Sequence, residues 1–198
     1  MQTLEDIAAG LGAEADRILE ATGLLAMLED RFGAAALTGS ARYGLMVWRD
    51  LDIHMPVEPE RRLEFAGLLP EIGRRLEAAG LRLRQAQFLD DYVDPHPLGA
   101  GFYWGTEFRD SSRRPWKADL WGWAPDDFAR RQAQDRELIA QLARADRHLI
   151  LSLKSEARAR DGYYGAVVGS MDIYRFVLAQ AGTTLAELET WKLTYREY

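Results

Sequence analysis

The chain has 198 residues, a net charge of −6 at pH 7 and no cysteine. The missing cysteines exclude a disulfide framework, Cys-ligated zinc and a thiol nucleophile, and the acidic balance argues against broad nucleic-acid binding, which needs a basic surface. No apolar run approaches the roughly 20 residues that span a bilayer, and the acidic, amphipathic start is unlike a targeting peptide. We therefore expect a cytoplasmic protein with one well-buried core, or a core plus a helical appendage, and no membrane contact.

The first part of the chain is expected to be helical. Residues 3–32 carry apolar side chains at the helical spacing. Gly10, Gly12 and Gly23 are expected to divide this stretch into two or three short helices, because glycine lowers helix stability.

Five strands are predicted further along the chain, at residues 34–39, 49–57, 81–89, 101–110 and 115–123. The first strand ends in the turn Gly39-Ser40, and a helix over 41–47 is expected to follow. The apolar period of 60–79 is also helical, although a proline and a glycine inside it argue against one unbroken helix. The last two strands are close enough in sequence to pair as a hairpin.

The remainder of the chain is predicted to be helical. The sequence Ala-Pro-Asp-Asp at 124–127 is typical of a helix start, and residues 124–198 are expected to form three or four helices packed on the sheet. Residues 1–123 are expected to hold the N-terminal helices and a core over 33–123. The predicted fold class is α+β, a small mixed β-sheet flanked by helices with a helical C-terminal region.

Asp50 and Asp52 are separated by one apolar residue within a predicted strand, so their side chains share one face. Two like charges this close repel unless a cation lies between them, and oxygen ligands without cysteine favour magnesium or manganese over zinc. The plainer alternative is a solvated pair or ion pairs with Arg42 and Arg49. The Gly39-Ser40 turn just upstream favours the metal hypothesis, since such a turn suits a phosphate.

Asp119 is a third acidic candidate, because it lies in an apolar, aromatic strand between Ala118 and Leu120. A carboxylate in such surroundings needs a partner. Lys117, two residues earlier on the same face, could be that partner through an ion pair. The alternative is a metal site shared with the two earlier aspartates.

These motifs together resemble the nucleotidyltransferase superfamily with the DNA polymerase β-type palm. Thr-Gly-Ser at 38–40 is followed after nine residues by Asp-Leu-Asp-Ile at 50–53, and Ala-Asp-Leu comes later at 118–120. Among the members of this superfamily, the chain is most similar to the small antibiotic nucleotidyltransferases. The motif resemblance covers residues 33–123, whereas 124–198 resembles the family only in being helical.

The resemblance implies a role for each motif residue. Asp50, Asp52 and Asp119 would hold two metal ions that bridge a triphosphate and an attacking hydroxyl. Asp119 would also help to orient or deprotonate the acceptor. Gly39 and Ser40 would bind the β- and γ-phosphates, and in-line attack on the α-phosphate would release pyrophosphate.

Further polar residues are candidates for supporting roles. Arg42, Lys117 and Lys154 could contact the nucleotide, although Arg42 could equally be a surface residue. Glu107 is a reserve candidate for the general base. His54 could contact a ligand or simply line the rim of the site.

Two charged clusters bear on the choice of substrate. Arg109, Arg113 and Arg114 flank the predicted hairpin and could stabilise the triphosphate, or could be a solvated hairpin end. The acidic stretch 90–96, which ends in His96, could attract a cationic acceptor such as an aminoglycoside, or could be a solvated loop.

The predicted function is magnesium-dependent transfer of a nucleoside monophosphate from a nucleoside triphosphate, with ATP as the expected donor, to a hydroxyl of a small molecule. One alternative is adenylylation of a partner protein, as in toxin or antitoxin systems. The other is a palm without catalysis that binds a nucleotide or a partner. A nucleic-acid acceptor is not expected.

Overall fold

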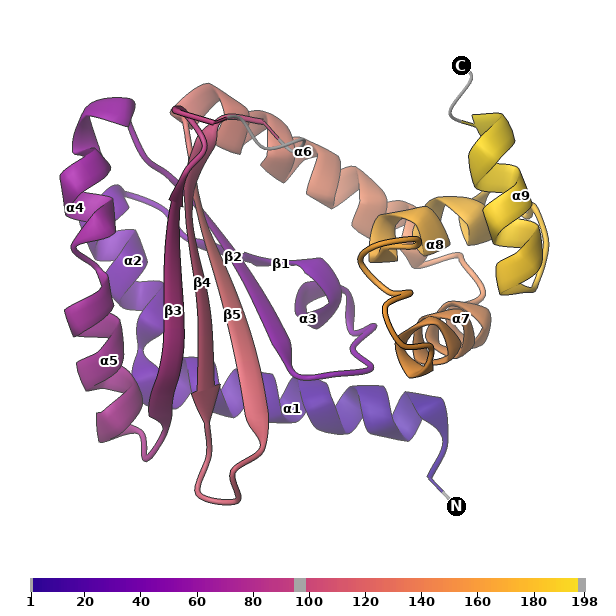
Figure 1. The fold of residues 1–198 in the computed structure, drawn as a ribbon, viewed down its shortest axis with the longest axis horizontal. Coiled ribbons are helices and arrows are strands. Elements are labelled where there is room, and N and C mark those ends of the chain that lie inside the picture. The colour runs from indigo at the N-terminus through magenta and orange to yellow at the C-terminus, as the bar shows by residue number, and fades with distance from the viewer. Residues whose placement is uncertain (1, 95–98, 196–198) are drawn as a thin grey trace.

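A five-stranded mixed sheet forms the centre of the computed structural model, which describes residues 2–94 and 99–195 (Figure 1). The strand order is β1-β2-β5-β4-β3, and only the pair β2–β5 is parallel among the described residues. The strands are β1 (Ala36–Thr38), β2 (Asp50–Pro56), β3 (Arg82–Asp90), β4 (Gly101–Arg109) and β5 (Pro115–Trp123). His96 of the predicted acidic loop lies outside the described residues.

Helices precede, interrupt and follow the strands. They are α1 (Leu4–Thr22), α2 (Leu24–Phe32), α3 (Gly39–Tyr43), the short 3-10 helix η1 (Pro59–Arg61), α4 (Arg62–Ala66), α5 (Leu69–Ala78), α6 (Pro125–Leu142), α7 (Arg147–Ala159), α8 (Ser170–Leu178) and α9 (Leu185–Tyr195). The mixed sheet, its flanking helices and the helical C-terminal region confirm the predicted fold class. None of the helices among residues 2–94 and 99–195 combines the length and the apolar composition that crossing a membrane requires.

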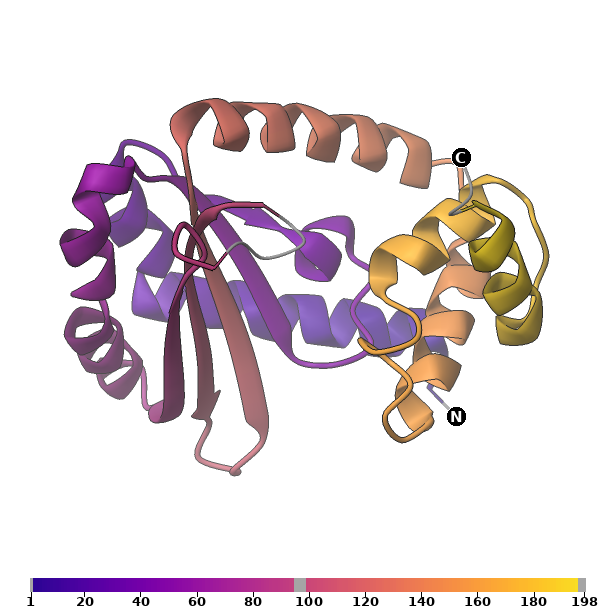
Figure 2. The ribbon, with the colours of Figure 1, turned by 45° about the horizontal axis from the view of Figure 1, so that its top comes forward.

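The sheet has one apolar and one polar face. Along β2, buried and partly exposed residues alternate, with Leu51 and Ile53 buried and the two aspartates on the other side. The apolar face packs against α1, α2, α4 and α5 in the larger core. A second core joins α7, α8 and α9 to Leu45 and the first half of α1. In Figures 1 and 2, α6 connects the sheet to this C-terminal group of helices.

The prediction that Gly10 and Gly12 break the first helix is wrong. The helix α1 runs through both, begins with a capping box between Thr3 and Asp6, and ends at Gly23, whose φ is +57°. Each interior glycine costs about 1 kcal/mol relative to alanine. The apolar side chains that α1 buries in both cores outweigh this cost.

Two other helices differ from the predictions in their boundaries. The helix predicted over 41–47 begins earlier, at Gly39, and ends at Tyr43, because Gly44 adopts a left-handed conformation with φ +66°. The segment 45–49 is therefore irregular. The stretch 60–79 is divided into η1, α4 and α5, as its proline and glycine indicate.

Candidate active site

The parallel pairing of β2 with β5 brings the predicted acidic residues together. In this register Asp52 lies opposite Asp119, and Asp50 lies opposite Lys117. Because residues opposite each other in neighbouring strands project to the same side, the three aspartates share the polar face of the sheet. Strands from distant parts of the chain thus place these carboxylates side by side.

Burial and the repulsion between like charges disfavour the charged forms of Asp50 and Asp52. Burial, together with the neighbouring charges of Asp50 and Asp119, raises the pKa of Asp52 to about 8. Burial and the charge of Asp119 also raise the pKa of Asp50. One oxygen of Asp50, Oδ2, accepts a hydrogen bond from the indole of Trp48 at 3.2 Å, whereas its buried Oδ1 has no hydrogen-bond partner. A cation at this place would relieve both the repulsion and the unsatisfied oxygen.

The turn at Gly39 lies directly against Asp52. Gly39 has φ +64°, and a Cβ atom at this position would lie 2.1 Å from Oδ2 of Asp52. The position therefore requires glycine for two reasons, its left-handed backbone conformation and its close approach to Asp52. Ser40, the next residue, is buried at the start of α3.

Asp119 has two partners on the polar face. The hydroxyl of Tyr103 on β4 donates a hydrogen bond to Oδ1 of Asp119 at 2.8 Å. The ammonium of Lys117 lies 3.7 Å from Oδ2, so the ion pair weighed from the sequence is present. The Lys117 side chain is 58% exposed, and an ion pair with a solvent-exposed partner contributes little to stability.

Lys154 lies in the protein interior rather than at an open surface. Its ammonium donates hydrogen bonds to the carbonyl of Leu45 at 2.7 Å and to the hydroxyl of Tyr174 at 3.1 Å, and the side chain is fully buried. It also lies 5.0 Å from the centre of the Trp48 ring. Burial lowers the pKa of Lys154 to about 7, against the opposing effect of Asp52 and Asp50. In this structure Lys154 anchors the segment 45–49 that leads into β2.

The other candidates lie at different distances from the aspartates. Arg42 is exposed on α3 and lines hollows whose lining contains none of the three aspartates. Glu107 lies opposite Lys117 on β4 and forms ion pairs with Arg84 and Arg109. His54 continues the polar face of β2, and burial lowers its pKa to about 4.

Three residues that the sequence analysis did not select support the site. Trp48 and Tyr103 donate the hydrogen bonds to Asp50 and Asp119 described above. Asp135 on α6 accepts hydrogen bonds from Thr38, at 2.8 Å, and from Tyr43, and so fixes both ends of the Gly39-Ser40 helix α3. No spacing in the sequence links α6 to this turn, so only the fold reveals the role of Asp135.

The donor set suits a hard divalent cation such as Mg²⁺. All the donors are carboxylate oxygens, and the buried Oδ1 of Asp50 has no hydrogen-bond partner. In the described part of the chain, no group of three or more acidic or histidine side chains is arranged to hold a metal ion. Asp119 is instead engaged by Tyr103 and Lys117. The metal set Asp50, Asp52 and Asp119 therefore stays a prediction.

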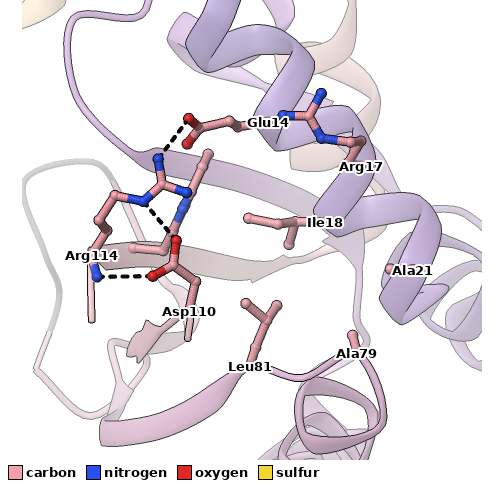
Figure 3. A pocket seen from close by; sticks show the side chains of 9 residues that line it. Glu14, Arg17, Ile18, Ala21, Ala79, Leu81, Asp110 and Arg114 are labelled. Atoms are coloured by element: carbon pink, nitrogen blue, oxygen red, sulfur yellow. Dashed lines mark hydrogen bonds and ion pairs between the residues drawn. The ribbon is translucent and has the colours of Figure 1, made fainter. Parts of the chain in front are cut away.

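A separate hollow of about 250 Å³ lies away from the aspartates, between α1 and the β4–β5 hairpin (Figure 3). Arg114 spans it, with ion pairs to Asp110 at 2.7 Å and to Glu14 at 3.0 Å. These charges neutralise one another, and Ile18 and Leu81 make the lining partly apolar. None of the three aspartates of the candidate site lines this hollow.

Comparison with known proteins supports the architecture. No family model matches the sequence, and no curated protein is similar to it in sequence. The fold is similar to that of the Cid1 poly(U) polymerase, in a crystal structure of a mutant bound to MgATP, with a TM-score of 0.52 and 14% sequence identity. The match covers 84% of this chain and 50% of the polymerase chain, so this chain spans about half the polymerase's length. Over most of its length the chain therefore shares the fold of part of this polymerase.

Proposed function

We propose that the protein transfers a nucleoside monophosphate from a nucleoside triphosphate, with ATP as the donor, to a hydroxyl of a small acceptor, and releases pyrophosphate. The observation that carries this proposal is the convergence of Asp50, Asp52 and Asp119 on one sheet face with the Gly39 turn packed against Asp52. The fold supports it, and the polymerase of similar fold is described as bound to MgATP.

In this proposal each residue has a defined task. Asp50 and Asp52 hold Mg²⁺, and Asp119 completes the metal site and orients the acceptor hydroxyl. When bound, the metal neutralises the triphosphate and favours attack on the α-phosphate. The backbone at Gly39 can approach a phosphate closely because it has no side chain, and Ser40 offers a hydroxyl. Lys117, which is largely exposed beside Asp119, adds a positive charge for the leaving pyrophosphate.

A thermal-shift panel of the four ribonucleoside triphosphates, with and without Mg²⁺, tests the nucleotide site. A ligand at about 100 times its Kd stabilises the protein by roughly 2.7 kcal/mol, or about 5 to 11 °C in Tm for a chain of this size. We expect a magnesium-dependent shift that Asp52→Asn abolishes. The matched control is Asp30→Asn, the same change at an exposed position on α2.

A pyrophosphate-release assay with candidate acceptors then tests catalysis. Turnover that Asp52→Asn abolishes and Asp30→Asn preserves supports the transferase. A magnesium-dependent shift without pyrophosphate release for any acceptor, including proteins of a lysate followed with labelled nucleotide, would favour a palm that only binds nucleotide. No shift with any nucleotide in a folded sample would refute the nucleotide site itself.

A further inference from the structure

A second hollow, of about 540 Å³, lies at the end of the sheet where β3 begins and β4 ends. Four arginines contribute to its lining: Arg82, Arg84, Arg109 and Arg113. This is a local concentration of positive charge on a chain whose net charge is −6. A hollow of this size is in the range of small-molecule sites.

The positive charge of this arginine hollow is only partly neutralised. Arg84 and Arg109 share one carboxylate, that of Glu107, at 2.6 and 3.4 Å. The side chains of Arg82 and Arg113 have no ion pair or hydrogen bond within the part of the chain that the structure describes. The other nearby acid, Asp110, is engaged by Arg114 at 2.7 Å. Two of the four guanidinium groups therefore share one carboxylate, and the other two have none among the described residues.

One of the guanidinium groups of the arginine hollow has a buried donor without a partner. The Nε atom of Arg109 is buried and has no hydrogen-bond partner, which is unfavourable for a donor. An anion between these side chains would offset the repulsion among the guanidinium groups.

The arginine hollow is connected to the aspartates along the polar face of the sheet. Arg109 lies opposite Arg82 on β3, Glu107 lies opposite Lys117, and Gly105 lies opposite Asp119. At about 3.4 Å per residue, the four positions from Gly105 to Arg109 span on the order of 14 Å.

We propose that the arginine hollow binds the phosphate group of the acceptor. This inference rests on the proposed function. The acceptor is then a small phosphate-bearing molecule whose reacting hydroxyl lies on the order of 14 Å from that phosphate, given the strand spacing. Guanidinium groups bind phosphates through paired, charge-assisted hydrogen bonds. A cationic acceptor, which the acidic loop suggested, would be repelled here.

The test titrates inorganic phosphate into the full chain in EDTA, so that no metal-dependent site contributes. NMR follows the side-chain Nε–H signals of the arginines. We expect a saturable shift of the Arg109 signal in the wild type, and at least tenfold weaker binding in the double variant Arg109→Gln with Arg113→Gln. The control is Arg130→Gln, an exposed arginine of α6 paired with Asp127, which should bind phosphate like the wild type. Circular dichroism verifies that each variant is folded.

Equal phosphate affinity in the wild type and the double variant would overturn the site. If the Arg113→Lys variant binds as weakly as the double variant, paired hydrogen bonding rather than charge is confirmed as the basis of binding. A 12-residue single-stranded oligonucleotide that displaces phosphate from the same arginines with more than hundredfold higher affinity would overturn the small-molecule assignment. Phosphate binding without any magnesium-dependent nucleotide shift would leave the anion site in place and refute only its link to nucleotidyl transfer.

Discussion

The close approach of Gly39 to Asp52 permits a test of the site geometry that needs no substrate. In the variant Gly39→Ala, the new Cβ atom would be placed 2.1 Å from Oδ2 of Asp52, at a residue with φ +64°. Real Cβ contacts are never this short, so either the turn or the carboxylate must move. The change perturbs the predicted phosphate turn and the predicted metal ligand together.

The expected cost of Gly39→Ala has two parts. A left-handed conformation costs alanine about 1–2 kcal/mol. Forcing an extra methyl group into a filled space typically costs about 1–3 kcal/mol more. The sum of about 2–5 kcal/mol is a large fraction of the stability of an ordinary domain. For a chain of this length each kcal/mol lowers Tm by about 2–4 °C.

Urea unfolding of the metal-free protein measures this cost, with Gly33→Ala as the matched control. Gly33 also has a left-handed backbone, with φ +85°, but a Cβ there meets nothing within 4 Å. Gly33→Ala should therefore show only the conformational part. In an Asp52→Ala background the excess cost of Gly39→Ala over Gly33→Ala should shrink, because the carboxylate is gone and only the contact of 3.2 Å to the Cβ atom of residue 52 remains.

Equal costs for the two glycine variants in the wild-type background would refute the reasoning. They would mean that the Asp52 carboxylate does not lie against the turn. The proposed phosphate and metal sites would then lose the contact that brings them together.

Two further predictions concern the side chains around the aspartates. Tyr103→Phe removes the donor to Asp119; it should lower the free energy of unfolding by about 1 kcal/mol and weaken the magnesium-dependent nucleotide shift. The control Tyr163→Phe removes an exposed hydroxyl bonded to Glu189 and should leave that shift unchanged. Equal nucleotide shifts in the two variants would contradict the role of Tyr103. Burial lowers the pKa of Lys154 from 10.5 to about 7, so the unfolded chain binds more protons between these values and the stability rises with pH across this window. Lys154→Met should flatten this rise in urea unfolding between pH 7 and 10 in metal-free buffer, and an undiminished rise would show that Lys154 does not titrate there.

The local patterns of the sequence predicted the elements that hold the site. The alternation of Leu51 and Ile53 with the two aspartates defines a strand with one buried face, and this period of two is a property of neighbouring residues. The positions of the strands were predicted to within a few residues for the same reason. The apolar, aromatic surroundings of Asp119 in the sequence selected it as the third acid, and the register places it opposite Asp52.

The contacts that tune the site depend on the tertiary structure and were not predictable. The hydrogen bond from Tyr103 to Asp119 exists only because β4 pairs with β5 in one register. The helical period around Lys154 predicted a helix, but not that its ammonium would be buried against Leu45. Gly10 shows the converse, since a local helix breaker was overruled by the apolar surface that α1 buries.

The parallel pairing of β2 and β5 also bears on how the protein folds. A shift of β5 by one residue would turn Asp119 into the apolar core and Ala118 or Leu120 onto the polar face. Because an unpaired carboxylate in that core is very costly, misregistered sheets are strongly disfavoured. Asp119 thus helps to fix the register of β5 against β2. Asp119 lies on β5, the last of the five strands to be synthesised. A chain still emerging from the ribosome therefore cannot bring Asp50, Asp52 and Asp119 together until β5 has been synthesised.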